Sequence, residues 1–280
     1  MLGIEAQRGS KAKGAVTSEA KIVMRNLEMA FVDRRAKTRT QALADVNLTV
    51  REGEFVCMLG PSGCGKSTIL NLVAGFLAPT SGEVVVAGAP VAGPSPDRGV
   101  VFQEATLFPW LSVWDNVTFG PRMRKLPRSA YEHTARQYVA HVGLAGFEHH
   151  LPLQLSGGMQ QRAALARVLV NNPDVLLMDE PFGALDAQTR LIMQELLLKL
   201  WDAERKTVLF ITHDIEEAIL LADRICIMTA RPGRIKQIIA VALPRPRGYG
   251  MIASPAFIDL KRQVLELIRE ESLAALAQGF

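Results

Sequence analysis

The sequence predicts an α/β fold with a mostly parallel central sheet, an antiparallel β subdomain and a helical subdomain. Short apolar segments with the pattern of buried strands alternate along the chain with helical segments, which is how parallel sheets are built. Four of these apolar segments end at a glycine-rich loop or at a polar residue that could carry chemistry. A strand-rich stretch precedes them, and a proline-interrupted helical stretch lies between the second and the third.

The composition is that of a globular protein. The 280 residues are 49% hydrophobic and 21% charged, with a net charge of +4. No apolar run reaches the roughly 18 residues of a membrane-spanning helix. Residues 1–20 are small and polar, which predicts a flexible N-terminus without a secretory signal. We therefore expect a cytoplasmic protein whose contact with a membrane is peripheral.

Neither the cysteines nor the basic residues indicate a further binding class. Three scattered cysteines are too few for a disulfide framework or a zinc site. Basic residues gather at 34–39 and 122–128, without the long stripe of interleaved aromatic side chains that nucleic-acid-binding surfaces show. We expect no nucleic acid partner.

The first elements form a hairpin and a strand–loop–helix unit. Residues 22–32 and 42–50 are rich in β-formers and are joined by a polar, cationic loop, which predicts a β-hairpin. The continuously apolar residues 55–59 predict a buried strand. A glycine-rich loop follows at once, and a helix is predicted from 66 to 77, where Pro79 would stop it.

The middle of the chain holds the helical subdomain. Residues 83–87 predict an antiparallel edge strand, and residues 100–102 predict a buried strand that ends at Gln103. Helical pattern interrupted by prolines then predicts a subdomain at about 106–165. The elements predicted after it are a helix at 156–170, a strand at 175–178, a helix at 186–205, a strand at 207–212, a helix at 214–221, and strands at 224–229 and 235–241.

The last segment, 243–280, is predicted to be a linker and a helix. Ser254 and Pro255 are residue types favoured at the cap and first position of a helix. The apolar residues that would share one face of this helix are Phe257, Leu260, Val264, Leu267 and Ile268.

The four apolar strands predict one shared ligand site. They end at Leu59 before the glycine-rich loop, at Phe102 before Gln103, at Met178 before Asp179, and at Thr212 before His213. In parallel sheets ligands bind outside the carboxyl ends of the strands. The groups that follow these strands are therefore expected to line one edge of the sheet.

The glycine-rich loop has the spacing G-x-x-x-x-G-K-S of a phosphate-binding loop. Its residues are Gly60, Pro61, Ser62, Gly63, Cys64, Gly65, Lys66, Ser67 and Thr68. Backbone N–H groups of such a loop wrap phosphate oxygens, and the following helix points its positive end at the same anion. Lys66 is predicted to reach the β- and γ-phosphates and Ser67 to bind Mg²⁺.

Four further side chains would complete the chemistry. Asp179 suits Mg²⁺ binding, and Glu180 would accept a proton from the attacking water as general base. His213 could reach the γ-phosphate from the opposite side, and Gln103 could bind Mg²⁺ and orient water. The alternatives without a function are that Asp179 and Glu180 are solvated acids, that His213 is structural and that Gln103 is a surface amide. Phe31 could stack on a purine or could equally be a core aromatic.

A second anion site is predicted at Ser156, Gly157 and Gly158, which open a helix. One nucleotide needs one phosphate cradle, yet the chain has two. The simplest explanation is that the second cradle serves a nucleotide bound by another copy. The sequence therefore predicts a head-to-tail dimer with two shared ATP sites.

Residues 22–241 resemble the ATPase subunits of ABC transporters. The resemblance rests on Walker A at 60–68, the Q-loop Gln103, the signature Leu155-Ser-Gly-Gly-Met-Gln-Gln-Arg162, Walker B at 175–180 and the H-loop His213. It implies an ABC ATPase domain at 21–242 that has the P-loop NTPase fold with a RecA-like parallel core, and ATP and Mg²⁺ as ligands.

The resemblance also implies roles at the subunit interface. Ser156, Gly158 and Gln160 would act on ATP held by the partner subunit, and Asp186 in the D-loop-like segment 183–186 would lie at the dimer seam. Phe31 would be the aromatic that stacks on adenine.

The type of transporter is indicated by segments 103–111 and 228–235, which look like the nitrate, sulfonate and taurine importer group. This similarity implies integral membrane permease subunits as partners, a solute-binding protein as an indirect partner, and a place at the cytoplasmic face of the cell membrane. Segment 103–120 would contact the permease. Its apolar residues are Leu107, Phe108, Trp110 and Leu111, some of which could instead pack in the core.

Other functions fit the sequence less well. An ABC ATPase for another small solute remains an alternative. A soluble ABC ATPase of DNA repair would need a long coiled coil before the signature, and a translation type would need two sets of motifs. A small-molecule kinase would not need the signature, and the intact Lys66, Asp179, Glu180 and His213 argue against a non-catalytic scaffold.

Overall fold

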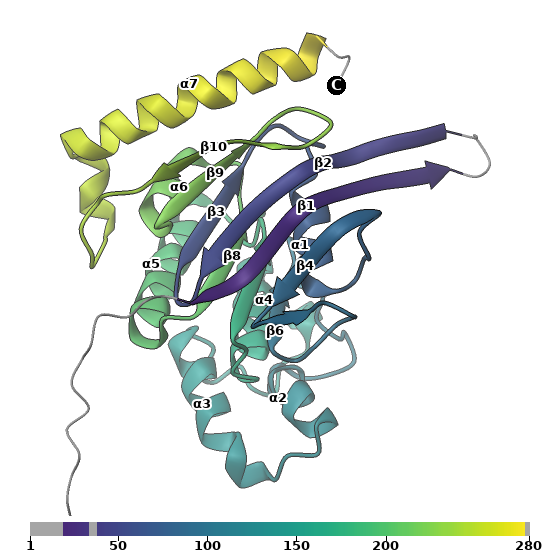
Figure 1. The fold of residues 1–280 in the computed structure, drawn as a ribbon. Helices are drawn as coiled ribbons and strands as arrows, with labels where there is room; N and C mark the ends of the chain where they lie inside the picture. Colours follow the sequence, from purple (N-terminus) through teal and green to yellow (C-terminus); the bar gives the residue numbers. More distant parts are fainter. Residues whose placement is uncertain (1–18, 34–37, 278–280) are drawn as a thin grey trace, which may run out of the picture.

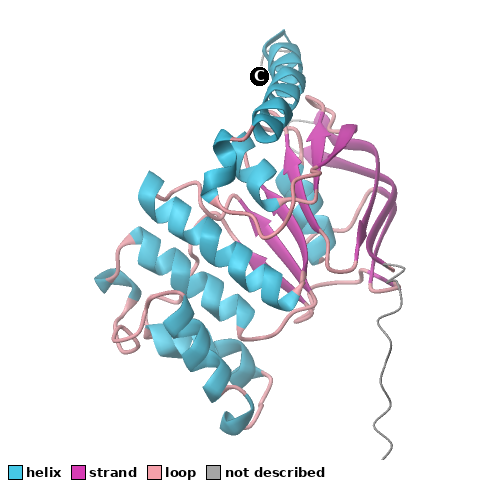
Figure 2. Ribbon diagram, turned by 90° about the vertical axis from the view of Figure 1, so that its left-hand side faces the viewer, coloured by secondary structure: helices cyan, strands magenta, loops and turns pink. Residues whose placement is uncertain are grey.

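The computed structural model describes residues 19–33 and 38–277. Residues 1–18, which carry the predicted flexible N-terminus, and most of the basic group at 34–39 lie outside the described residues. A six-stranded sheet of order β10-β9-β3-β8-β7-β6 lies beside a four-stranded sheet of order β2-β1-β4-β5 (Figure 1). Helices cover the side of the six-stranded sheet that faces away from the four-stranded one (Figure 2).

The six-stranded sheet is the predicted parallel core. Its strands are β3 (Phe55–Leu59), β6 (Arg98–Val101), β7 (Val175–Asp179), β8 (Thr207–Ile211), β9 (Arg224–Met228) and β10 (Ile235–Ala240). All neighbouring pairs are parallel except β10 and β9. Because β3, β8, β7 and β6 are consecutive neighbours, their carboxyl ends meet at one edge, as the strand-end pattern predicts.

The strand β3 shows why this sheet is buried on both faces. Phe55, Cys57 and Leu59 pack into one hydrophobic cluster with α-helical residues, while Val56 and Met58 pack into a second cluster toward the four-stranded sheet. Side chains of a strand alternate between its two faces, so a continuously apolar strand can serve two cores. Cys57 of β3 and Cys226 of β9 are both fully buried in this sheet.

The four-stranded sheet confirms the hairpin and corrects one detail. Strands β1 (Ala20–Asp33) and β2 (Thr38–Arg51) pair antiparallel, and β4 (Ser81–Val86) pairs antiparallel with β1. The predicted edge position of β4 is wrong, because the two-residue strand β5 (Ala89–Pro90) pairs with its outer side.

The helices keep the predicted order with small changes at their ends. They are α1 (Lys66–Ala74), α2 (Val113–Met123), α3 (Glu132–His141), α4 (Gly157–Leu169), α5 (Ala187–Glu204), α6 (Ile215–Leu221) and α7 (Pro255–Ala277), with short 3₁₀ turns at Arg128–Ala130, Pro152–Gln154 and Tyr249–Ala253. Helix α1 ends before Gly75, which has a φ of 84°, and does not continue to Leu77 as predicted. The left-handed glycine closes the helix, so Pro79 is not its stop signal.

Helices α4 and α7 connect the helical unit and the C-terminal segment to the main core. Helix α4 contacts both α2 and α3, which project from the sheet region as a helical unit (Figures 1 and 2). Helix α7 begins as predicted, with Ser254 Oγ accepting a hydrogen bond from the N–H of Phe257 at 3.4 Å. Phe257 and Val264 are fully buried against the main core.

Candidate functional site

The loop between β3 and α1 is shaped to hold an anion. Gly63 and Gly65 have φ values of 73° and 98°, which side-chain-bearing residues rarely adopt. A Cβ on Gly65 would also collide with the Leu43 side chain. No side chain caps the N-terminus of α1. Its first N–H groups are therefore free of a competing side-chain acceptor and suit a phosphate, at the positive end of the helix dipole.

Lys66 is held against its own loop. Its Nζ donates hydrogen bonds to the carbonyl oxygens of Gly60 at 2.8 Å and Pro61 at 3.0 Å, and the residue is only 7% exposed. Burial raises the pKa of the neighbouring Cys64 thiol, so this side chain is neutral and packs below the loop. The ammonium group is thus placed inside the loop, and Cys64 can offer a ligand only its backbone.

A cavity of about 280 Å³ opens beside the phosphate loop. It is lined by Phe31, Thr40, Ala42, Ser62, Gly63, Gly65, Lys66, Ser67, Thr68, Glu180 and Arg231. Phe31 is 44% exposed, so it is not the core aromatic that the sequence left as an alternative. Its exposed ring lies where a base could stack while the phosphates occupy the loop.

Asp179 and Ser67 are in contact and offer oxygen ligands for Mg²⁺. Desolvation raises the pKa of the Asp179 carboxyl, while a hydrogen bond from Ser67 and the charge of Lys66 oppose the rise. No group of three or more His, Cys, Asp or Glu side chains that could hold a metal occurs in residues 19–33 and 38–277. Mg²⁺ fits such a site, because it is commonly bound by one or two carboxylates together with substrate phosphates.

Glu180 lies between the phosphate-loop cavity and His213. Its Oε2 is 3.0 Å from Nδ1 of His213, a pairing that the sequence did not predict. The backbone of Glu180 has a φ of 44°, and its N–H donates to the carbonyl of Ile211 at 2.9 Å. Left-handed backbone at a residue other than glycine is strained and concentrates at functional sites. This conformation turns the carboxylate toward the cavity and His213.

Gln103 does not line the phosphate-loop cavity. Strand β6 is separated from β3 by β8 and β7. It is, however, the direct neighbour of β7, with Val101 opposite Met178, so the segment that carries Gln103 starts about 5 Å from the end of β7, where Asp179 contacts Ser67. Gln103 is therefore placed on the Asp179 side of the site, although it is not part of the cavity wall.

The signature segment opens α4 away from the same cavity. Ser156 caps the helix by accepting a hydrogen bond from the N–H of Met159 at 3.3 Å, and both Ser156 and Gly157 are exposed. A Cβ on Gly157 would meet no atom within 4 Å. None of Ser156, Gly157, Gly158 or Gln160 lines the cavity. This chain therefore does not bring its two predicted anion sites together.

Two other predicted interface residues make local hydrogen bonds. Gln160 Nε2 donates to the carbonyls of Pro152 at 3.0 Å and Leu155 at 3.3 Å, which fixes the turn before the signature. Asp186 caps α5 by accepting from the N–H of Thr189 at 3.0 Å, and this hydrogen bonding lowers the pKa of its carboxyl. Asp186 keeps an exposed, charged position at the helix start.

Three residues that the sequence did not single out also shape the site. Arg231 Nη2 and Nε donate to the carbonyl of Gly63 at 3.3 and 3.4 Å. The buried Gln161 donates to the carbonyl of Phe102 at 3.0 Å, and Arg167 donates to the carbonyl of Thr106 at 2.9 Å. Both link α4 to the segment after β6. Gln161 lies in the signature and Arg231 in a basic turn, but neither sequence pattern predicts the hydrogen bonds that these two residues make.

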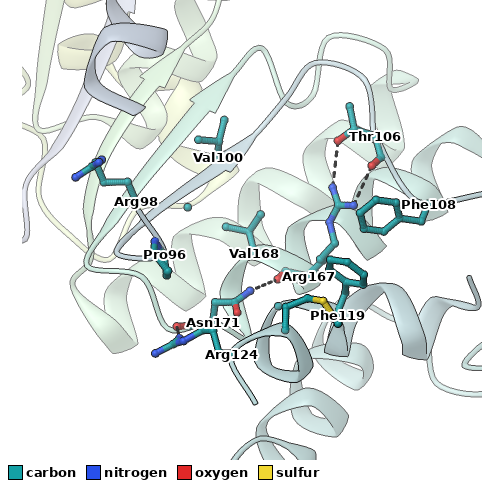
Figure 3. A pocket seen from close by; sticks show the side chains of 13 residues that line it. Pro96, Arg98, Val100, Thr106, Phe108, Phe119, Arg124, Arg167, Val168 and Asn171 are labelled. Carbon is teal, nitrogen blue, oxygen red and sulfur yellow. Dashed lines mark hydrogen bonds between the residues drawn. The ribbon is translucent and has the colours of Figure 1, made fainter. Parts of the chain in front are cut away.

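A larger cavity of about 540 Å³ is lined by residues of β6, α2 and α4 and of the segment after β6, and we call it the α2–α4 groove (Figure 3). Phe108 and Phe119 lie on one side of it, with ring centroids 4.5 Å apart, and Arg167 stacks over Phe108 at 5.7 Å. Burial lowers the pKa of Arg167. Trp110 beside the groove is 73% exposed, whereas Leu107 packs partly against the core.

Comparisons with known proteins agree with these observations. The profile of the ABC transporter family matches residues 43–183. The chain is 50% identical over 238 residues to an uncharacterized ABC transporter ATP-binding protein of Methanocaldococcus jannaschii, covering 85% of this chain and 88% of that protein. It is 51% identical over 251 residues to the taurine import ATP-binding protein TauB of Pelagibacter ubique, covering 88% of this chain and 94% of that protein.

A solved structure shares the fold. It is a dimeric structure of MJ0796, a bacterial ABC transporter cassette, with a TM-score of 0.71 and 34% identity over 80% of this chain and all of that one. A post-hydrolysis state of the same cassette, bound to ADP and Pi, matches with a TM-score of 0.70. The phosphate loop, the carboxylates and histidine at neighbouring strand ends, and these similarities lead to one conclusion: the chain belongs to the ABC transporter family, as an ATPase.

Proposed function

We propose that this chain is the ATP-hydrolysing subunit of an importer for small anions of the taurine, sulfonate or nitrate type. The observation that carries the transport part is the 51% identity to a taurine import ATP-binding protein over 88% of the chain. The chain would bind permease subunits at the cytoplasmic face of the cell membrane, and a solute-binding protein would deliver the anion to the permease. No helix among the described residues is long and apolar enough to span a membrane.

The hydrolytic step follows from the arrangement at the strand ends. The phosphate loop and Lys66 would bind the phosphates of ATP, and Ser67, Asp179 and Gln103 would hold Mg²⁺. Mg²⁺ neutralises charge on the phosphate oxygens when it is bound. Water attacks the γ-phosphorus as the bond to ADP breaks, and Glu180 accepts the proton of that water. The 3.0 Å contact with His213 would hold the Glu180 carboxylate in place.

Two copies would act together. The exposed helix start at Ser156 and Gly157 of one copy would bind the phosphates of ATP held by the other, with Gly158 and Gln160 beside it and Asp186 at the seam. This proposal is supported by the outward position of α4 relative to the cavity of its own chain and by the dimeric form of the related cassette. Either two identical chains or two paired ATPase subunits would fit.

The α2–α4 groove is the proposed docking site for the permease. Its wall includes Phe108, and Arg167 connects the segment after β6 to α4 (Figure 3). The exposed Trp110 lies beside the groove, with its ring centroid 5.7 Å from that of Phe108. Helix α4 also carries the signature at its start. A cytoplasmic segment of the permease seated here could therefore respond to movement of the helical unit when two copies close on ATP.

Trp110→Asp is expected to weaken association with the permease by at least about tenfold, because a buried charge at a docking surface is costly. Its ATPase activity in the isolated chain should stay near wild type. Co-purification with the membrane subunits and the solute-binding protein measures the association, and a transport assay with taurine, nitrate and other solutes identifies the anion.

The matched control for docking is Ile258→Asp, which places the same charge at an exposed apolar residue of α7, remote from the groove. Equal losses of association in both variants would argue against the groove. Loss of ATPase activity in isolated Trp110→Asp with unchanged permease association would also contradict docking at this residue.

Phe31→Ala is expected to weaken ATP binding about five- to tenfold, because one stacked aromatic contact is removed from the cavity wall. Phe31→Tyr keeps the ring and should bind ATP as the wild type does. Titration with ATP in the absence of Mg²⁺, which prevents turnover, measures the ATP affinity of both variants. Wild-type affinity in Phe31→Ala would show that the base does not stack there.

A further inference from the structure

The turn between β9 and β10, residues 229–234, forms one wall of the phosphate-loop cavity. Arg231 lines the cavity and donates to the carbonyl of Gly63. Gly233 is packed so closely that a Cβ there would collide with the carbonyl oxygen of Cys64. The turn therefore lies directly against two consecutive residues of the phosphate loop.

The same turn is fastened to β2 by the backbone. The N–H of Gly233 donates to the carbonyl of Ala42 at 2.8 Å, and the N–H of Ala44 donates to the carbonyl of Gly233 at 3.0 Å. Ala42 is itself a cavity residue. A displacement of the turn would thus change the position of two cavity walls and the backbone of the loop that receives the phosphates.

Helix α7 contacts this turn from its other side. Glu271 Oε2 accepts a hydrogen bond from the N–H of Ala230 at 2.8 Å, and Glu271 Oε1 pairs with Lys236 of β10 at 2.7 Å. Glu271 is only 9% exposed and Ala230 only 6%. Helix α7 runs across this end of the molecule beside β9 and β10 (Figure 1). The carboxylate therefore connects the C-terminal helix to the residue that precedes Arg231.

Contacts other than those of Glu271 also hold α7 in place. The first half of the helix buries Phe257 and Val264 in the main core, and Lys261 pairs with Glu216 of α6 at 2.6 Å. A carboxylate is costly to bury unless it is paired and hydrogen-bonded. Glu271 meets this condition through the N–H of Ala230 and the ammonium of Lys236, and both partners belong to the 229–234 turn or the strand that follows it.

We propose that Glu271 is a positioning residue for the nucleotide site. Through the N–H of Ala230 it holds the 229–234 turn against the phosphate loop, so that α7 sets the affinity for ATP without touching ATP. This inference rests on the proposed nucleotide binding at the phosphate loop. It gives a function to a segment that lies beyond the residues matched by the family profile.

The test compares three variants of the full chain. Glu271→Ala removes the acceptor of the Ala230 N–H and is expected to raise the Kd and KM for ATP about tenfold while kcat at saturating ATP changes less than about twofold. Glu271→Gln keeps an oxygen acceptor and should restore affinity to within about threefold of wild type. Calorimetric titration with ATP gives the Kd, and steady-state kinetics give the KM and kcat.

The matched control is Glu270→Ala. Glu270 pairs with the same Lys236 at 2.6 Å, but its side chain is 60% exposed, and the N–H of Ala230 donates its hydrogen bond to Glu271. Wild-type affinity is expected. A similar rise in Kd for Glu270→Ala would assign the effect to Lys236 and overturn the role of the turn.

A purely structural role for Glu271 gives a different result. It would lower the Tm of Glu271→Ala and leave the Kd for ATP unchanged, which would overturn the proposal. Combining Glu271→Ala with Arg231→Ala should raise the Kd less than the product of the single effects, because both act through one turn. If the two changes in binding free energy were fully additive, Glu271 and Arg231 would not act through the same turn. Failure of the wild-type chain to bind ATP would instead overturn the proposed function.

Discussion

Replacing Glu180 with Gln is expected to leave ATP binding intact and to slow ATP hydrolysis by at least about 100-fold. The amide has the shape of the carboxylate but cannot accept the proton of the attacking water, and a positioned general base contributes roughly 10²- to 10⁴-fold. Glu180 lines the phosphate-loop cavity and lies 3.0 Å from His213. Single-turnover hydrolysis and ATP titration on the same preparation separate the two effects.

Glu195→Gln is the control for this experiment, because it makes the same change at an exposed position of α5 outside the cavity. It should hydrolyse ATP as the wild type does. Hydrolysis near the wild-type rate in Glu180→Gln would mean that another group accepts the proton. Loss of ATP binding in this variant would place Glu180 in binding rather than in the chemical step.

Mixing two inactive variants is expected to restore ATP hydrolysis. Lys66→Ala disables the phosphate loop, and Ser156→Arg fills the exposed start of α4. In a head-to-tail dimer of one chain of each kind, both defects fall in one ATP site, and the other site keeps Lys66 and Ser156 intact. Each variant alone should lose at least about 100-fold in rate, since preorganised phosphate contacts are lost at every site. The ATPase rate of the mixture, measured after subunit exchange, reports the recovery.

The control mixture combines Lys66→Ala with Glu180→Gln. Both residues line the same cavity of one chain, so every site in a mixed dimer carries one defect and no recovery is expected. Recovery in this control would contradict the assignment of Lys66 and Glu180 to one site. An inactive Lys66→Ala and Ser156→Arg mixture, with exchange demonstrated, would contradict a shared ATP site.

Local patterns along the chain were sufficient for most elements. Five consecutive apolar residues between Glu54 and Gly60 predict β3 to the residue, because no polar side chain inside the segment competes for the sheet interior. The start of α7 at Ser254 and Pro255 was also predictable, because helix capping depends on adjacent residues. The end of α1 was not, because either Gly75 or Pro79 could have stopped it.

Some features of the candidate site could likewise be predicted from local patterns, and others could not. The identity of the strand-end groups could be read from the sequence, and the sheet order places their strands side by side. The Glu180–His213 contact could not be predicted, because it depends on a left-handed backbone at Glu180. The place of Gln103 beside the Asp179 end of β7 depends on the pairing of β6 with β7, which no local pattern specifies.

By itself, the sequence determined the alternation of strands and helices, the phosphate loop and the groups that follow each strand. These depend on side-chain periodicity, glycine conformation and residue spacing, which act over a few positions. Only the tertiary structure decided that Arg231 and Gly233 lie against the phosphate loop and that Glu271 of α7 holds their turn. Those contacts join residues that are 41 to 169 positions apart, and they form only when the sheet and α7 have packed.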